Sequence, residues 1–216
     1  MYESENLELV SYLKKTGALK SKFLEKALLK TPRHLFVPEN LQDSAYRDYP
    51  LHIGRGQTIS QPSTVVIMTQ LLEPKAGQKI LEIGSGSGWQ SALLSRLVGK
   101  KGKVFTVELI PELADFARKN LAKFKIKNVK VVEGNGSVGL GKEAPFDGII
   151  ITAAAPSIPG ALKSQLKTGG RIVAPVGNRY TQKMTVLKRT RKGFEQEEMP
   201  SYFAFVPLRG KEGFEE

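Results

Sequence analysis

Hydrophobic and polar positions change their spacing along the chain near residue 77. Before that point, apolar residues recur every three or four positions, a spacing typical of amphipathic helices. Prolines and glycines interrupt this pattern over 36–62 and predict an irregular segment there. The helices expected in this part of the chain cover 4–15, 20–30 and 63–72. We therefore expect an N-terminal helical and loop extension over 1–76, followed by a core over 77–216.

From residue 77 onward, short apolar runs alternate with stretches of helical spacing. The strands predicted by the apolar runs cover 79–83, 103–108, 129–133, 147–152 and 171–175. The helices expected between them cover 89–98, 111–124 and 158–167, the last one capped by Gly169-Gly170. Two further strands, joined by the polar segment 190–200, predict an antiparallel ending over 184–189 and 202–207. This alternation is typical of a doubly wound, Rossmann-like α/β fold, whose mostly parallel sheet has helices on both faces.

Three glycines, Gly84, Gly86 and Gly88, follow the first predicted strand of the core. Twenty residues after the last of them, Glu108 ends the second strand. Such glycines let the backbone approach a nucleoside closely, and an acid at this distance accepts hydrogen bonds from the ribose hydroxyls. Trp89 stands where a dinucleotide fingerprint would need its third glycine, so the spacing favours S-adenosylmethionine as the cofactor.

Composition excludes several kinds of chemistry. The chain has 216 residues, 40% of them hydrophobic, which is enough for one full core. It contains no cysteine and two histidines, so disulfides and thiolate chemistry are excluded and we expect no metal site. No stretch approaches the roughly 20 apolar residues of a membrane span, and the first residues are polar. We expect a cytoplasmic protein with no membrane partner.

The net charge of +12 raises the question of nucleic-acid binding. The lysines lie in separate stretches, over 14–30, 100–103, 119–130 and 183–192. Most of them fall on polar helix faces or in turns, where charges are solvated. Since they form no single basic tract in the sequence, we do not expect a nucleic-acid partner.

Several segments resemble the protein-L-isoaspartate O-methyltransferase family, and together they cover nearly the whole chain. The most specific is Gln57-Thr58-Ile59-Ser60, inside the longer signature 48–62. The others are 145–154, 165–170 and 205–208. The resemblance implies methyl transfer from S-adenosylmethionine to the free carboxylate of L-isoaspartyl residues in damaged proteins and peptides, with S-adenosyl-L-homocysteine as product. It also implies a sheet whose last two strands exchange places relative to most such methyltransferases. Separately from the resemblance, we expect a monomer.

The resemblance further implies roles for individual residues. Ser60 is implied as the catalytic residue, and we interpret it as a hydrogen-bond donor that orients the acceptor carboxylate. From the residues alone, Ser60 is equally placed to cap the helix that follows it. The implied substrate-binding residues are Thr58, Ser60, Thr152 and Ala153. The cofactor-binding residues, with the glycine loop and its acid included, are Gln57, Thr58, Ile59, Gly84, Ser85, Gly86, Gly88, Glu108, Asn135, Gly136 and Gln182.

Two acids and one amide complete the expectations for the site. Glu82, inside the first core strand, is expected to bind the amides of the glycine loop, and Asp147 to brace the fold. Asn135 stands where the family usually has an aspartate that accepts a hydrogen bond from adenine. Its side-chain oxygen can still accept that bond, but without the charge.

The sequence leaves two alternatives to an isoaspartyl methyltransferase open, although a carboxylate acceptor suits the residues present. A carboxylate with a pKa near 4 is already ionised at neutral pH, so its methylation needs no general base. The net charge keeps open a methyltransferase that acts on RNA or on another nucleophile. Asn135 keeps open a catalytically inactive module that only binds S-adenosylmethionine.

Overall fold

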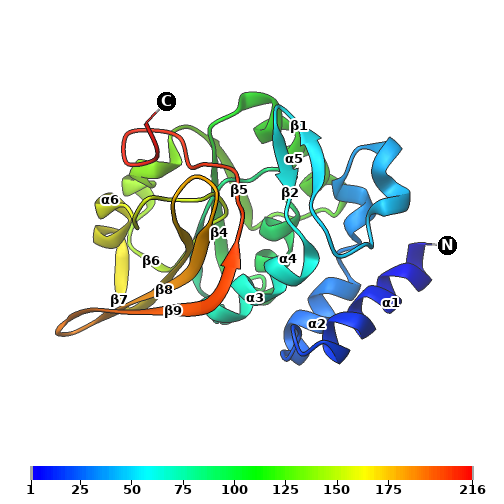
Figure 1. The fold of residues 1–216 in the computed structure, drawn as a ribbon, viewed down its shortest axis with the longest axis horizontal. Coiled ribbons are helices and arrows are strands. Elements are labelled where there is room, and N and C mark those ends of the chain that lie inside the picture. Colours follow the sequence, from blue (N-terminus) through cyan, green and yellow to red (C-terminus); the bar gives the residue numbers. More distant parts are fainter. Residues whose placement is uncertain (1, 216) are drawn as a thin grey trace.

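The computed structural model describes residues 2–215, and its centre is a seven-stranded sheet (Figure 1). The strands lie in the order β5-β4-β3-β6-β7-β8-β9. The first five strands of this order are parallel, while β8 and β9 are antiparallel to their neighbours. Their bounds are β3 Lys79–Ile83, β4 Lys103–Glu108, β5 Val129–Glu133, β6 Phe146–Ile151, β7 Leu166–Gly177, β8 Gln182–Thr190 and β9 Gly193–Phe203. The Rossmann-like α/β fold is confirmed.

The last two strands follow the order that the family resemblance implies. Strand β8 pairs with β7, and β9 pairs with β8 at the edge of the sheet. An ion pair between Lys183 of β8 and Glu198 of β9 joins these two strands. Because β9 is almost entirely exposed, its sequence carries no apolar run that would mark it as a strand.

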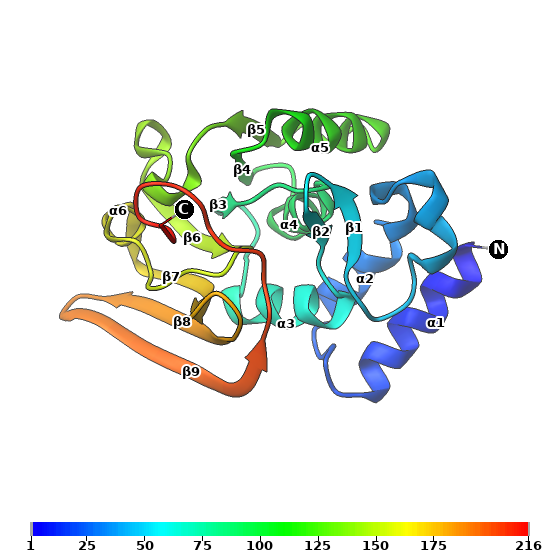
Figure 2. The same cartoon turned by 45° about the horizontal axis from the view of Figure 1, so that its top comes forward.

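Helices cover both faces of the parallel strands (Figure 2). Helices α3 (Pro62–Leu72), α4 (Trp89–Val98) and α5 (Pro111–Lys123) pack on one face, and α6 (Gly160–Ser164) packs against β7 on the other. Successive residues of β3 therefore meet different cores: Ile80 packs with α3 and α4, and Leu81 packs in the cluster that includes α6. Burial on both faces explains why these strands read as continuous apolar runs.

The N-terminal part of the chain packs against the helices of the core. It comprises α1 (Tyr2–Lys15), α2 (Lys22–Leu29), two short 3-10 helices over Arg33–Phe36 and Glu39–Ser44, and a hairpin of β1 (Leu51–Gly54) and β2 (Gln57–Ile59). Leu13, Leu24 and Phe36 share one hydrophobic cluster with Trp89 and Leu93 of α4. The boundary between residues 76 and 77 stays a prediction.

The predicted elements differ from the structure mainly after residue 157. The helix expected over 158–167 is only α6, because Leu166 already belongs to β7. Gly169 and Gly170 consequently lie inside that strand and do not cap a helix.

Two other segments contain structure that the pattern did not predict. The polar segment 190–200 is mostly strand β9, which ends at Phe203, so the strand expected over 202–207 is wrong. The segment 36–62 holds the β1–β2 hairpin as well as turns. Its strands are four and three residues long, too short to show a clear alternation of apolar and polar positions. No helix among residues 2–215 is long and apolar enough to cross a membrane.

Candidate active site

A cavity of about 110 Å³ lies at the carboxyl ends of β3, β4 and β6. The glycine loop after β3 forms one wall, the residues of β2 form another, and the C-terminal segment 206–209 lies across from them. Eleven of the residues predicted from the sequence line this cavity: Gln57, Thr58, Ile59, Ser60, Gly84, Ser85, Gly86, Glu108, Gly136, Thr152 and Ala153. The structure thus brings together segments that are far apart in the sequence.

The glycine loop turns tightly where β3 ends. Gly84 has a φ of +93°, and a Cβ atom there would lie 2.5 Å from Oγ1 of Thr152. That hydroxyl donates to the carbonyl oxygens of Ile83, at 2.9 Å, and Gly84, at 2.8 Å. Thr152 therefore holds the loop against β6, and any side chain at position 84 would displace it.

Gly88 has a different role from the other two glycines. It does not line the cavity but caps α4, and a Cβ atom there would lie 3.3 Å from the backbone of Ala117 in α5. A glycine at this position lets α5 pack closely on the loop, as the third glycine of such motifs commonly does.

Glu108 ends β4 and binds the loop from the side. Its Oε2 accepts a hydrogen bond from the amide of Gly86 at 2.9 Å, and its Oε1 accepts one from the amide of Ile110 at 3.1 Å. The side chain is 6% exposed and faces the cavity. This carboxylate is placed to accept hydrogen bonds from a diol next to the glycine loop.

Glu82 of β3 does not bind the amides of the glycine loop, so that expectation is wrong. Its residue is fully buried, its Oε2 accepts a hydrogen bond from the hydroxyl of Ser91 in α4, and its Oε1 has no partner. Burial raises the pKa of Glu82 to about 8, although the hydroxyls of Ser91 and Thr106 oppose the shift. Glu82 is also among the residues that line the cavity.

Ser60 is held over the cavity by its backbone. Its carbonyl oxygen accepts a hydrogen bond from the guanidinium of Arg33 at 3.1 Å. The N-cap residue of α3 is Gln61, and Asp48 accepts a hydrogen bond from the amide of Ser63 at 2.8 Å. The interpretation of Ser60 as a helix cap is therefore wrong, because Asp48 supplies that bond from outside the helix.

Arg33 itself is fully buried and connects three backbone segments. It donates to the carbonyl oxygens of Ala45 at 2.6 Å, Tyr49 at 3.2 Å and Ser60, and it stacks 5.4 Å from the ring of Trp89. Burial lowers the pKa of Arg33 to about 10, against the opposing effect of the Asp48 carboxylate. The guanidinium therefore keeps its charge at neutral pH.

Asn135 and Gln182 do not line the cavity but support its walls. Oδ1 of Asn135 accepts hydrogen bonds from the amide and the hydroxyl of Ser137, at 3.0 and 2.8 Å. Gln182 donates to the carbonyl oxygen of Asn178 at 2.7 Å and accepts from the amide of Phe205 at 2.9 Å. Their contacts to a cofactor stay predictions.

Asp147 braces the fold, as expected. Its Oδ2 accepts a hydrogen bond from the amide of Lys79 at 2.7 Å, and its Oδ1 pairs with Lys167.

The C-terminal wall of the cavity was not among the predicted site residues. Val206, Pro207, Leu208 and Arg209 line it, and backbone hydrogen bonds to Ala154 hold this segment against the end of β6. The family resemblance over 205–208 was the signal that could have pointed to it. An irregular segment carries no periodicity that would do so.

The residues present fit S-adenosylmethionine. The fit rests on the open backbone of the glycine loop and on the Glu108 carboxylate beside it. The cavity is smaller than the roughly 300–1,000 Å³ of typical ligand pockets.

This fold, with a glycine loop and an acid at the ends of adjacent parallel strands, defines a Rossmann-like methyltransferase. The sequence model of the protein-L-isoaspartate(D-aspartate) O-methyltransferase family matches residues 4–213. The chain belongs to this family.

Individual relatives agree over nearly the whole length. A protein-L-isoaspartate O-methyltransferase of Methanopyrus kandleri is 51% identical over 209 residues, which cover 96% of this chain and 92% of the relative. One from Aeropyrum pernix is 45% identical over 216 residues, covering 100% and 83%. A solved protein-L-isoaspartate O-methyltransferase structure superposes with a TM-score of 0.85 at 30% identity, covering 96% of this chain and 67% of that one.

A mutation of Glu108 tests the cofactor side of the cavity. We expect Glu108→Ala to weaken the binding of S-adenosyl-L-homocysteine by about tenfold or more, because a charge-assisted hydrogen bond contributes roughly 1.5–3 kcal/mol. Isothermal calorimetry measures the change. The matched control is Glu133→Ala, since Glu133 ends the neighbouring strand in register with Glu108 but is exposed. Equal affinities in the two variants would contradict the role.

A second prediction concerns the pH dependence of stability. Since the pKa of Glu82 is about 8 in the folded chain and near 4.5 when solvated, the folded chain binds its proton more tightly. Between these two pH values, raising the pH lowers the free energy of unfolding, by at most about 1.4 kcal/mol per unit. Urea denaturation of Glu82→Gln should lack this contribution. A stability difference from the wild type that stays constant from about pH 5 to about pH 8 would contradict it.

Proposed function

We propose that this chain transfers the methyl group of S-adenosylmethionine to the free carboxylate of L-isoaspartyl residues in damaged proteins and peptides. One observation carries the proposal. The segment Gln57–Ser60, the part of the sequence most specific to the family, lies in the same cavity as the glycine loop and Glu108. A family-specific segment and a general nucleoside site thus share one space, as transfer between two substrates requires.

The side chains around the cavity suit a carboxylate acceptor. The acceptor is ionised at neutral pH, so no residue has to remove a proton from it. Bound S-adenosylmethionine supplies a methyl group on a positively charged sulfur. The protein has to align the acceptor oxygen with that methyl group and exclude water, and such positioning contributes roughly 7–11 kcal/mol to lowering a barrier.

Ser60 is the residue we assign to orienting the acceptor. It lies beside Thr58 on the wall that closes the cavity, and the Arg33 bond fixes its backbone. The hydroxyl of Thr152, by contrast, is occupied by two carbonyl oxygens of the glycine loop. We therefore assign Thr152 and Ala153 to shaping the acceptor side, and donation to the carboxylate to Ser60.

The remaining assignments follow from the family and stay proposals. The partners are isoaspartyl-containing proteins and peptides. A monomer, a cytoplasmic location and the cofactor contacts of Gln57, Ile59, Asn135 and Gln182 remain predictions.

Methyl transfer from tritiated S-adenosylmethionine tests the function. The acceptors are an isoaspartyl peptide, its aspartyl isomer and total RNA. We expect base-labile label on the isoaspartyl peptide alone, because a methyl ester hydrolyses in mild base. Label on RNA would favour an RNA methyltransferase instead. Cofactor binding without transfer to any acceptor would favour an inactive binding module.

A serine substitution tests the acceptor side. We expect Ser60→Ala to lower turnover on the isoaspartyl peptide by roughly 10- to 150-fold, the loss of a hydrogen bond to a charged group. The affinity for S-adenosyl-L-homocysteine should change by less than about twofold. The control is Ser63→Ala, which removes a hydroxyl from the first turn of α3, outside the cavity. Unchanged turnover in Ser60→Ala would remove Ser60 from the mechanism.

A further inference from the structure

A broad groove of about 2,060 Å³ lies at the amino ends of the parallel strands, at the opposite end of these strands from the candidate active site. Its walls come from α2, from the end of α3, and from the turns that precede β3, β4 and β5. These turns lie at the amino ends of the parallel strands, whereas the glycine loop and Glu108 lie at the carboxyl ends. The strands between the two sites have five or six residues, or about 16–20 Å.

The groove holds most of the excess positive charge of the protein. Eleven of its lining residues are lysine or arginine and three are acidic, a balance of +8 out of the net +12. The rest of the chain carries the remaining +4. Three of the four lysine stretches, 14–30, 100–103 and 119–130, therefore contribute to one groove, because α2 and the turns before β3, β4 and β5 all face it.

Most basic side chains of the groove form no ion pair, whereas its three acids are bonded to other residues. Glu73 pairs with Arg171 at 2.8 Å, Glu143 pairs with Lys130 at 3.3 Å, and Asp48 caps α3. Within residues 2–215, nine exposed lysines of the groove form no ion pair: Lys20, Lys26, Lys30, Lys75, Lys100, Lys101, Lys103, Lys125 and Lys127.

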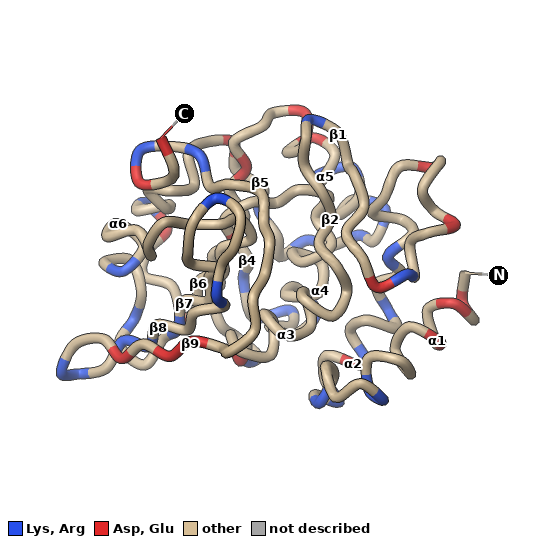
Figure 3. The backbone as a smooth tube through the Cα atoms, in the orientation of Figure 1, with Lys and Arg blue, Asp and Glu red and all other residues tan. Residues whose placement is uncertain are grey.

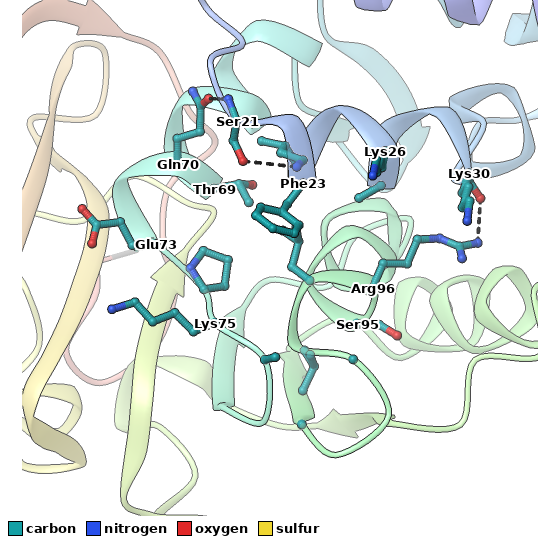
Figure 4. A pocket seen from close by; sticks show the side chains of 18 of the residues that line it. Ser21, Phe23, Lys26, Lys30, Thr69, Gln70, Glu73, Lys75, Ser95 and Arg96 are labelled. Atoms are coloured by element: carbon teal, nitrogen blue, oxygen red, sulfur yellow. Dashed lines mark hydrogen bonds between the residues drawn. The ribbon is translucent and has the colours of Figure 1, made fainter.

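An exposed aromatic ring stands among these lysines. Phe23, at the start of α2, is 79% exposed, and Figure 4 shows its ring reaching into the groove, with Lys26 further along the helix and Lys30 directly after its end. Hydrophobic packing does not account for this position, because the ring is mostly solvated. An aromatic face beside flexible amines is the arrangement that stacks a base while the amines contact phosphates.

We propose that this groove binds single-stranded nucleic acid, through its lysines to the phosphates and through Phe23 to a base. An acidic polypeptide would also be attracted by the lysines, but it has no flat group that requires the exposed ring. The groove lies across the sheet from the cavity, so the bound strand is a ligand and not a methyl acceptor. This inference does not depend on the proposed function.

Fluorescence anisotropy with a labelled oligothymidylate of about 15 nucleotides tests the proposal. Thymidylate contains no adenine, and saturating S-adenosyl-L-homocysteine keeps the active-site cavity out of the measurement. The groove variant is Lys100→Gln/Lys101→Gln/Lys103→Gln. The charge-matched control is Lys188→Gln/Arg191→Gln/Lys192→Gln on the β8–β9 hairpin, whose basic tip lies far from α2 in Figure 3. Thermal unfolding verifies that each variant is folded.

We expect the groove variant to bind about tenfold or more weakly and the hairpin variant to bind within about twofold of the wild type. The slope of log affinity against log salt should fall in magnitude by about 2 in the groove variant, since single strands contribute about 0.7 per neutralised phosphate. Phe23→Ala should weaken binding by about fivefold or more, and Phe23→Trp should restore it. Tyr180→Ala, which removes a ring that is 83% exposed elsewhere, should have no effect.

Three results would overturn the proposal. One is the absence of binding at about 0.15 M salt. Another is an equal loss of affinity in the groove and hairpin variants, which would mean unspecific attraction by net charge. The third is a polyglutamate chain of equal charge that displaces the oligonucleotide fully while Phe23→Ala has no effect, which would identify a site for acidic polypeptides.

Discussion

The buried guanidinium of Arg33 is the interaction on which the active-site cavity depends. Removing a charge from water costs several kcal/mol, and here the carbonyl oxygens of Ala45, Tyr49 and Ser60 and the face of Trp89 compensate for it. Ala45 and Tyr49 lie in the segment before β1, Ser60 follows β2, and Trp89 begins α4. Strand β2 pairs with β1 alone among the described strands, so the Arg33 bond to the carbonyl oxygen of Ser60 ties the end of this hairpin to the N-terminal part of the chain.

The cofactor side and the acceptor side of the cavity are made of different kinds of structure. The cofactor side is made by parallel strands, where Glu108 and Thr152 hold the glycine loop in place from two neighbouring strands. The acceptor side is made by a short hairpin and an irregular C-terminal segment, which side chains and isolated backbone bonds hold in place. A shift of the acceptor side would therefore break no hydrogen bond of the seven-stranded sheet, whereas a shift of the cofactor side would.

The sequence predicts the regular part of the fold well and the irregular or exposed parts poorly. Apolar runs mark the parallel strands and helical spacing marks the helices between them, so β3, β4, β5 and α4 lie where the pattern predicts them. Edge strand β9 is exposed, so its polar sequence looks like a loop. The role of Glu82 was missed because a carboxyl group inside a strand meets whichever helix packs on that face, and this is a property of the tertiary structure.

The basic groove is a second feature that the sequence alone did not predict. A basic tract is recognisable in sequence only when its lysines are consecutive, and in this chain they are not. In a parallel sheet, however, all strands begin at the same end, so the turns that precede them lie close together. Residues dozens of positions apart in the sequence therefore share a surface. The lysines in these turns and on α2 therefore all raise the electrostatic potential in the groove. The acids Glu73 and Glu143 nearby are neutralised by Arg171 and Lys130. Because potentials from a concave wall of one sign reinforce each other, the groove attracts polyanions far more than an even spread of the same charge would.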